Sequence, residues 1–427
     1  MLLKRFIGAA VMLAIYAAHT MANGVTKEEL ARAAVSDDAE ASRTAIAELR
    51  GMGQKGLDAI IAVHSLDIER FSATGDKSGN WQRLASAIDS VAMQKDAYAS
   101  GLYWYTDLEE AKNVADDRNR PILSLRLLGN LNEEYSCANS RLFRSILYAN
   151  KELAAYLREN YVLHWRSVRP APRITIDFGD GRKIERTITG NSIHYVLDEH
   201  GMIIDALPGL YGPNAFLIYL KQAAAVNRSI DGHPAADRHR ALLRYRKLSF
   251  DKIKERRNNA LKLAEISLKE TGGGTDALSA APIAATKMAV VDEISLLRVY
   301  DNFARFEPQI DLSDWQKVSA IYIKENGLDA ASKAFIRRQN RNSGRTEGEL
   351  AGLFEKLGRF ISLDTTRNDF LYRTQIYSLL NRSEVRDLEQ FNDRVYGEIF
   401  MTPSSDRWLG LYSTDVYTAL DGNGVVQ

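Results

Sequence analysis

Pro121-Ile122-Leu123-Ser124-Leu125-Arg126-Leu127-Leu128 is a short, almost continuous apolar run that begins directly after a proline. Such runs are typical of strands in a sheet that is covered on both faces. The sequence on either side alternates between helical patterns and short apolar segments. It therefore predicts an α/β domain in which residues 122–128 form a buried strand.

Predicted helices and strands surround this segment in a regular order. Thr106-Asp107-Leu108-Glu109 is a helix cap, so we expect a helix that ends near Arg118. The loop after the strand carries Cys137. The remaining expected elements are helical pieces over 141–148 and 151–159, a strand over 161–165, a hairpin over 174–188, strands over 193–197 and 202–206, and a helix from near Pro213.

This order resembles that of the extracytoplasmic thioredoxin-like families over roughly residues 100–225. Two helix-to-strand passages carry the resemblance, Asp107-Leu108-Glu109-Glu110-Ala111 leading to Asn119-Arg120-Pro121-Ile122-Leu123, and Lys151-Glu152-Leu153 leading to Glu159-Asn160-Tyr161-Val162-Leu163. Asp198-Glu199-His200-Gly201 matches the turn that precedes the last strand and helix of the family. The resemblance implies a thioredoxin-like central domain over residues 100–225.

The same resemblance assigns positions in the redox motif. Cys137 falls on the first cysteine of the C-x-x-C motif, and Ser140 stands in place of the second. Ser192 stands where the family has its cis-proline, and the 174–188 hairpin where it usually has a helix. The resemblance thus implies a C-x-x-S site, in which Cys137 is the nucleophile and Ser140 and the Asn191-Ser192 loop form the receiving surface.

Cys137 is the one cysteine in the chain, so an internal disulfide is excluded. A thiol at the start of a helix is favoured as the thiolate by unpaired backbone N–H groups and the helix dipole. Because Ser140 cannot resolve a mixed disulfide, release needs an outside thiol. The first hypothesis is monothiol thiol-disulfide exchange or capture of a thiol-containing protein or small thiol. The alternative is a non-enzymatic envelope scaffold with a redox-inactive domain.

His164 and His194 lie on two predicted strands that can be neighbours, which raises a Cys137/His164/His194 metal site as a possibility. Their spacing is unlike the close i, i+2 or i, i+4 pairs common in metal sites. The sequence also has no phosphate-binding loop, dinucleotide fingerprint or Ser-His-Asp signature. We therefore predict neither a metal nor a cofactor.

Residues 1–22 have the layout of a secretory signal peptide. Lys4 and Arg5 precede an uncharged apolar run over 6–18, and small residues end the segment. The run is shorter than the roughly 20 apolar residues of a spanning helix. We expect an exported protein, periplasmic or extracellular, with no stable membrane span after signal cleavage.

The rest of the chain is predicted to be helical. Residues 23–99 form an N-terminal region that contains a HEAT-type hairpin or a small helical cap, and residues 226–427 form a C-terminal domain.

The formal charge is +1, which argues against nucleic acid as a partner. The basic stretch 239–270 is a solvated helix face or a contact for a membrane or polyanion. The aromatic ending is predicted to pack back onto the helices, and the alternative is an aromatic binding surface made by Trp408, Tyr412 and Tyr417.

Overall fold

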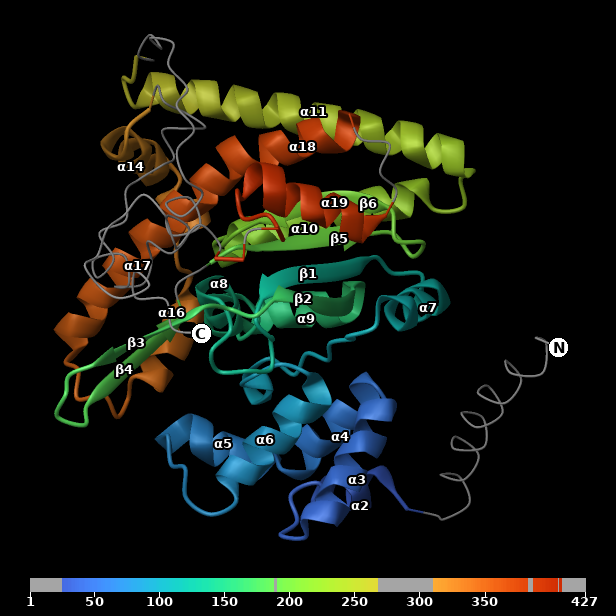
Figure 1. Cartoon of the computed structure of the whole chain (residues 1–427), viewed down its shortest axis with the longest axis vertical. Helices are drawn as coiled ribbons and strands as arrows, with labels where there is room; N and C mark the ends of the chain where they lie inside the picture. Colours follow the sequence, from blue (N-terminus) through green and yellow to red (C-terminus); the bar gives the residue numbers. More distant parts are fainter. Residues whose placement is uncertain (1–24, 188–189, 268–309, 383–386, 406, 409–427) are drawn as a thin grey trace. The chain divides into compact units, whose positions relative to one another are not determined.

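The computed structural model describes residues 25–187, 190–267, 310–382, 387–405 and 407–408 (Figure 1). The chain divides into two compact units, Met1–Tyr103 and Trp104–Gln427. The predicted signal peptide, Tyr412 and Tyr417 lie outside the described residues. Among the helices that the structure describes, none is long and apolar enough to cross a bilayer.

The first unit is helical, as predicted. A capping box between Thr26 and Glu29 begins its first helix. The Asp38 carboxylate accepts hydrogen bonds from two backbone N–H groups and starts a second helix. The elements are α2 (Lys27–Ala33), α3 (Ala39–Gly51), α4 (Gln54–Val63), α5 (Ser65–Thr74), α6 (Trp81–Ala92) and η1 (Ala97–Ala99).

The core of the first unit is shared by more than one helical pair. Leu49 of α3, Leu57 and Ile60 of α4, and Ile88 of α6 are completely buried. Helix α2 packs on both α3 and α4, and α6 also packs on both. The unit is therefore a small multi-helix bundle, which fits the predicted small helical cap better than a single HEAT-type hairpin.

The second unit contains a four-stranded mixed sheet in the order β2-β1-β5-β6. Its strands are β1 (Ile122–Leu128), β2 (Val162–Arg169), β5 (Ser192–Leu197) and β6 (Ile203–Pro208). β1 is parallel to β2 and antiparallel to β5, and β5 is antiparallel to β6. Every residue of β1 is buried, which confirms the prediction of a covered central strand. The chain is therefore α/β in class.

Helices connect and cover these strands (Figure 1). They are α7 (Leu108–Arg118), α8 (Ala138–Leu142), the π-helix η2 (Phe143–Leu147), α9 (Lys151–Asn160) and α10 (Pro213–Ile230). α7 and α9 contact β2, and α10 contacts β6. The predicted hairpin is present as β3 (Arg173–Asp177) and β4 (Lys183–Thr187), which form a separate two-stranded sheet.

The helices that follow residue 226 belong to the same compact unit as the sheet. They are α11 (Ala235–Leu263), α14 (Leu312–Ile321), α15 (Ile323–Asn326), α16 (Ala330–Gln339), α17 (Glu347–Arg367), η4 (Asn368–Arg373), α18 (Thr374–Arg382), α19 (Leu388–Arg394) and η5 (Val395–Ile399). η4 packs on β6, and α11 packs on α18 (Figure 1). The predicted division at residue 225 therefore does not separate two compact units.

The basic stretch of α11 is only partly a solvated face. Arg240 and Lys252 are exposed, whereas Arg246 is 5% exposed and donates a hydrogen bond to the carbonyl oxygen of Ile203. Arg256 forms an ion pair with Glu325 at 3.0 Å. Part of the stretch therefore attaches α11 to the rest of the unit.

Candidate functional site

Cys137 lies at the N-terminal end of α8, in the loop that follows β1. Its backbone N–H donates to the carbonyl oxygen of Leu128 at 3.0 Å, which attaches the loop to the end of the strand. This position at a helix start agrees with the sequence prediction. The Cys137 side chain, however, is completely buried. The thiol therefore does not meet solvent in this structure.

Ser140, at the second motif position, is also completely buried. Its hydroxyl lies 2.6 Å from the hydroxyl of Ser136 and 2.8 Å from the carbonyl oxygen of Cys137. The Ser140 side chain thus forms local hydrogen bonds that hold the first turn of the helix. It presents no donor to an incoming molecule.

The Asn191-Ser192 loop lies beside the cysteine loop, as the sequence predicted. The Asn139 side-chain amide donates to the carbonyl oxygen of Gly190 and, at 3.1 Å, to the Ser192 hydroxyl. Both Asn191 and Ser192 are completely buried. The structure thus brings all four predicted site residues into one region but leaves none of them as an exposed receiving surface.

Residues near the end of the described chain cover this region. The Asn191 amide donates to the Thr402 hydroxyl at 3.1 Å, and the Tyr396 hydroxyl donates to the Asn191 carbonyl oxygen at 3.2 Å. Arg169 of β2 donates to the carbonyl oxygen of Pro403 at 3.2 Å. The prediction that the C-terminal segment packs back is confirmed for these residues, whereas Trp408 is 40% exposed.

Two tyrosines lie near the Cys137 sulfur in this closed environment. Burial raises the pKa of Tyr148 and of Tyr396 well above the usual value for a phenol, and the charge of a Cys137 thiolate adds to each increase. Both phenols therefore remain neutral at physiological pH. The thiol is thus buried beside aromatic side chains, whereas a typical reactive cysteine is partly exposed.

His164 and His194 cannot share a metal ion. His164 is paired in register with Ser124 of β1, and His194 with the next residue, Leu125. Since successive strand residues point to opposite faces, the two imidazoles lie on opposite faces of the sheet. His164 Nδ1 lies 2.9 Å from the Ser124 hydroxyl, and His194 Nε2 lies 2.7 Å from the Tyr148 hydroxyl. No cluster of three possible metal ligands occurs within the described ranges.

Burial lowers the pKa of both imidazoles to about 3. For His164, the nearby guanidinium groups of Arg126 and Arg166 contribute to this low pKa. Both rings are therefore neutral at physiological pH. They act as hydrogen-bonding core residues rather than as acid–base groups in an accessible site.

Two strands contain a buried charged residue whose role the sequence did not predict. Arg126 of β1 is completely buried and donates to Glu389 of α19 at 2.6 Å. Asp205 of β6 is 1% exposed and accepts from Arg373 of η4 at 2.7 Å. The available signal was a charged residue inside an otherwise apolar strand, which requires a buried partner.

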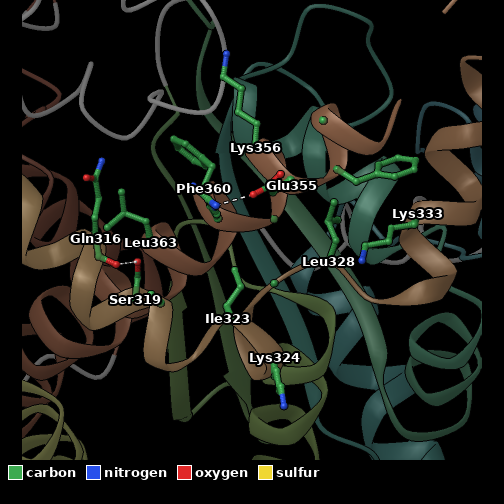
Figure 2. Close-up of a pocket in the computed structure, with 16 residues that line it drawn as sticks. Gln316, Ser319, Ile323, Lys324, Leu328, Lys333, Glu355, Lys356, Phe360 and Leu363 are labelled. Carbon is green, nitrogen blue, oxygen red and sulfur yellow. Dashed lines mark hydrogen bonds and ion pairs between the residues drawn. The ribbon is translucent and has the colours of Figure 1, made fainter. Parts of the chain in front are cut away.

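The second unit also contains a groove of about 1060 Å³ between α14, α15, α16 and α17. In Figure 2, Ile323, Leu328 and Phe360 lie around the same space. Ile323 at the rim is 37% exposed, so the groove is open to solvent. Lys324 and Lys333 add positive charge to its edge. The groove can therefore hold an apolar protein segment whose carboxylates lie at the edge of the groove, near the lysines.

No family model, curated protein or solved structure matches this chain. The second unit offers two features of its own, a cysteine loop closed by the chain itself and an open apolar groove with a basic edge.

Proposed function

We propose that this protein is a non-enzymatic interaction protein of the cell envelope, built on a redox-inactive thioredoxin-like domain. The observation that carries the proposal is the complete burial of Cys137 beside an equally buried Ser140. Thiol-disulfide exchange requires the sulfur to approach a second sulfur in line, which needs open space on one side of the thiol. An envelope location is supported by the secretory layout of residues 1–22.

Strand order supports the thioredoxin-like part of the proposal. A helix and a strand precede the cysteine loop, a parallel strand follows it, and an antiparallel pair and a helix complete the domain. Cys137 lies after the central strand β1, and the Asn191-Ser192 loop lies at the start of β5. This is the arrangement that the resemblance implies for a redox motif and for the loop opposite it.

Monothiol exchange through Cys137 is the competing function. The contact between Asn139 and Ser192 favours it, because this contact holds the two loops together as a receiving surface would require. Exchange would nevertheless need Tyr396 and Thr402 to leave the Asn191 loop first. The closed arrangement therefore suits a structural role for Cys137 better than repeated thiol-disulfide exchange.

The groove between α14 and α17 is the surface that we assign to a partner. Its apolar lining and the exposed Lys324 and Lys333 match a protein segment that combines apolar side chains with carboxylates. Such a segment would bury Ile323 and pair with the lysines at the rim. This geometry supports binding without a chemical step.

The reactivity of the Cys137 thiol tests the proposal. The alkylation rate of native protein should be at least ~1000-fold lower than that of urea-unfolded protein, since reaction requires local opening of a buried core. As a matched control, Ser78→Cys in a Cys137→Ala chain places a thiol in an exposed segment and should react at the rate of a free thiol. Native Cys137 that reacts as fast as this control would favour exchange.

A cellular assay tests the interaction role separately. In cells that depend on the protein, Cys137→Ala should retain function, whereas Ile323→Asp should lose it because it places a charge on the apolar lining of the groove. Leu66→Asp, at a side chain that is 80% exposed, controls for adding a surface charge. Loss of function in Cys137→Ala, together with mixed disulfides in wild-type cells, would reject the proposal.

A further inference from the structure

The hairpin of β3 and β4 is a two-stranded sheet, separate from the four-stranded one (Figure 1). β3 pairs antiparallel with β4, and Ile176 lies opposite Ile184. Within the part of the chain that the structure describes, no other strand pairs with β3. An edge strand with unpaired backbone groups can accept a further strand, and a sheet of only two strands gains stability when it does.

The hydrogen bonds of the hairpin determine which backbone groups of β3 lie at its outer edge. The Phe178 N–H donates to the carbonyl oxygen of Arg182 at 3.1 Å, so these two residues form a hydrogen-bonded pair. Such pairs alternate with non-hydrogen-bonded pairs along an antiparallel ladder, so Ile174 and Ile176 direct their N–H and C=O groups toward β4. The other residues of β3 direct theirs to the outer edge. They are Arg173, Thr175 and Asp177.

The sequence of β3 is complementary to itself in the antiparallel direction. Arg173-Ile174-Thr175-Ile176-Asp177 begins with a cation and ends with a carboxylate. If Thr175 lies opposite Thr175 of a second copy, Arg173 of one copy lies opposite Asp177 of the other, and Ile174 opposite Ile176. The same register makes hydrogen-bonded pairs of the residues that direct their backbone groups outward. Backbone and side chains therefore favour one register.

The charged side chains at this edge are accessible. Arg173, Thr175 and Asp177 are exposed. The Asp177 carboxylate pairs with Lys183 of β4 at 3.0 Å and is still 50% exposed, so it can accept from a second cation. The Arg173 guanidinium lies 4.7 Å from the centre of the Tyr135 ring, a contact that leaves its charge unneutralised. Each copy thus offers one cation and one carboxylate at matching positions.

The opposite face of the hairpin is apolar. Ile174, Ile176 and Ile184 are half-buried and share this face, because alternate residues of a strand point the same way. Pairing through β3 would join these side chains to those of a second copy in one continuous apolar surface.

The outer edge of β4 suits a second copy less well. The antiparallel register that places Lys183 opposite Glu185 also places Arg182 opposite Arg186. The register two residues further along places Glu185 opposite its own copy. Like charges directly opposite each other destabilise a strand pair, so β3 is the edge that fits.

We propose that two copies of this chain associate through the outer edges of β3, in an antiparallel register centred on Thr175. The two hairpins then form one four-stranded sheet, and the contact has twofold symmetry because each copy uses the same residues. This dimer goes beyond the proposed function and does not depend on the α14–α17 groove or on Cys137.

Sedimentation equilibrium of the full chain at concentrations up to ~100 µM tests the proposal. Thr175→Pro should weaken the dimer at least ~10-fold, because proline removes an N–H group at the centre of the contact. Glu185→Pro is the matched control. Glu185 lies opposite Thr175 and directs its own N–H to the outer edge of β4, so the dissociation constant should not change.

Charge reversal tests the register. Arg173→Glu and Asp177→Lys should each weaken the dimer, because each places like charges opposite each other twice. A mixture of the two variants should associate, since the new acid of one chain then lies opposite the new base of the other. This rescue also shows that both variants fold. A wild-type chain that stays monomeric, a dimer that Thr175→Pro weakens no more than Glu185→Pro, or variants that do not associate on mixing would overturn the proposal.

Discussion

At the scale of single residues, a buried ion pair joins the sheet to the helices that follow it. Asp205 of β6 accepts hydrogen bonds from Arg373 at 2.7 Å, Tyr245 at 2.7 Å and Tyr377 at 2.8 Å. Asp205 and Arg373 are each 1% exposed. A buried charge is tolerated when it is paired and hydrogen-bonded, so these contacts depend on one another.

Asp205→Ala should lower the free energy of unfolding by about 3 kcal/mol, because it leaves the buried Arg373 guanidinium with only its longer contact to the Asp369 carboxylate, at 3.4 Å. Urea unfolding followed by tryptophan fluorescence measures the change. Asp237→Ala is the control, since Asp237 forms an exposed pair with Arg240 on α11, and it should cost less than about 1 kcal/mol. If the two substitutions lowered the free energy of unfolding equally, the buried pair would contribute no more to stability than an exposed pair.

At the scale of elements, local sequence signals predicted where helices and strands lie, but not how closely they approach. The strand over 122–128 has the predicted limits, because an apolar run after a proline is a local signal. The π-helical geometry of 143–147 was not predicted, since it depends on the packing around the helix. Close contacts between helices, such as the one at Gly56, could not be predicted from the sequence either. A Cβ atom there would overlap the carbonyl oxygen of Leu49 in α3.

Gly56→Ala should destabilise the first unit by about 2 kcal/mol, since relieving the overlap with the Leu49 backbone forces α4 away from α3. Hydrogen exchange of the α4 backbone amides should accelerate accordingly. Gly51→Ala provides a matched control in the neighbouring helix, where a Cβ would meet nothing within 4 Å. It should be neutral, or stabilising by up to about 1 kcal/mol through helix propensity. A slow-exchanging α4 in Gly56→Ala would contradict this account.

At the scale of the whole molecule, the two buried imidazoles link stability to pH. The folded-state pKa of His164 and His194 is lowered to about 3, whereas an unfolded histidine titrates near 6.5. Between these values the unfolded chain binds protons that the folded chain does not. The stabilisation is therefore present in full above pH 6.5 and is lost as the pH falls toward 3.

Lowering the pH from 7 to 5 should reduce the free energy of unfolding by about 2 kcal/mol for each buried imidazole. His194→Gln should make this decrease smaller by the contribution of one imidazole to the free energy of unfolding. Urea unfolding at both pH values measures the difference. His200→Gln, at a side chain that is 54% exposed, is the control for the removal of an imidazole. An identical pH dependence in wild type and His194→Gln would show that His194 is not the group responsible.

The amino-acid sequence by itself determined the α/β class, the helical first unit and the limits of the central strand, because caps, turns and apolar periodicity act over a few residues. Only the tertiary structure decided that Cys137 is buried and that His164 and His194 face apart. The contact that closes the site joins Asn191 to Thr402, 211 positions away. Such a contact depends on how whole elements pack, which no local pattern records.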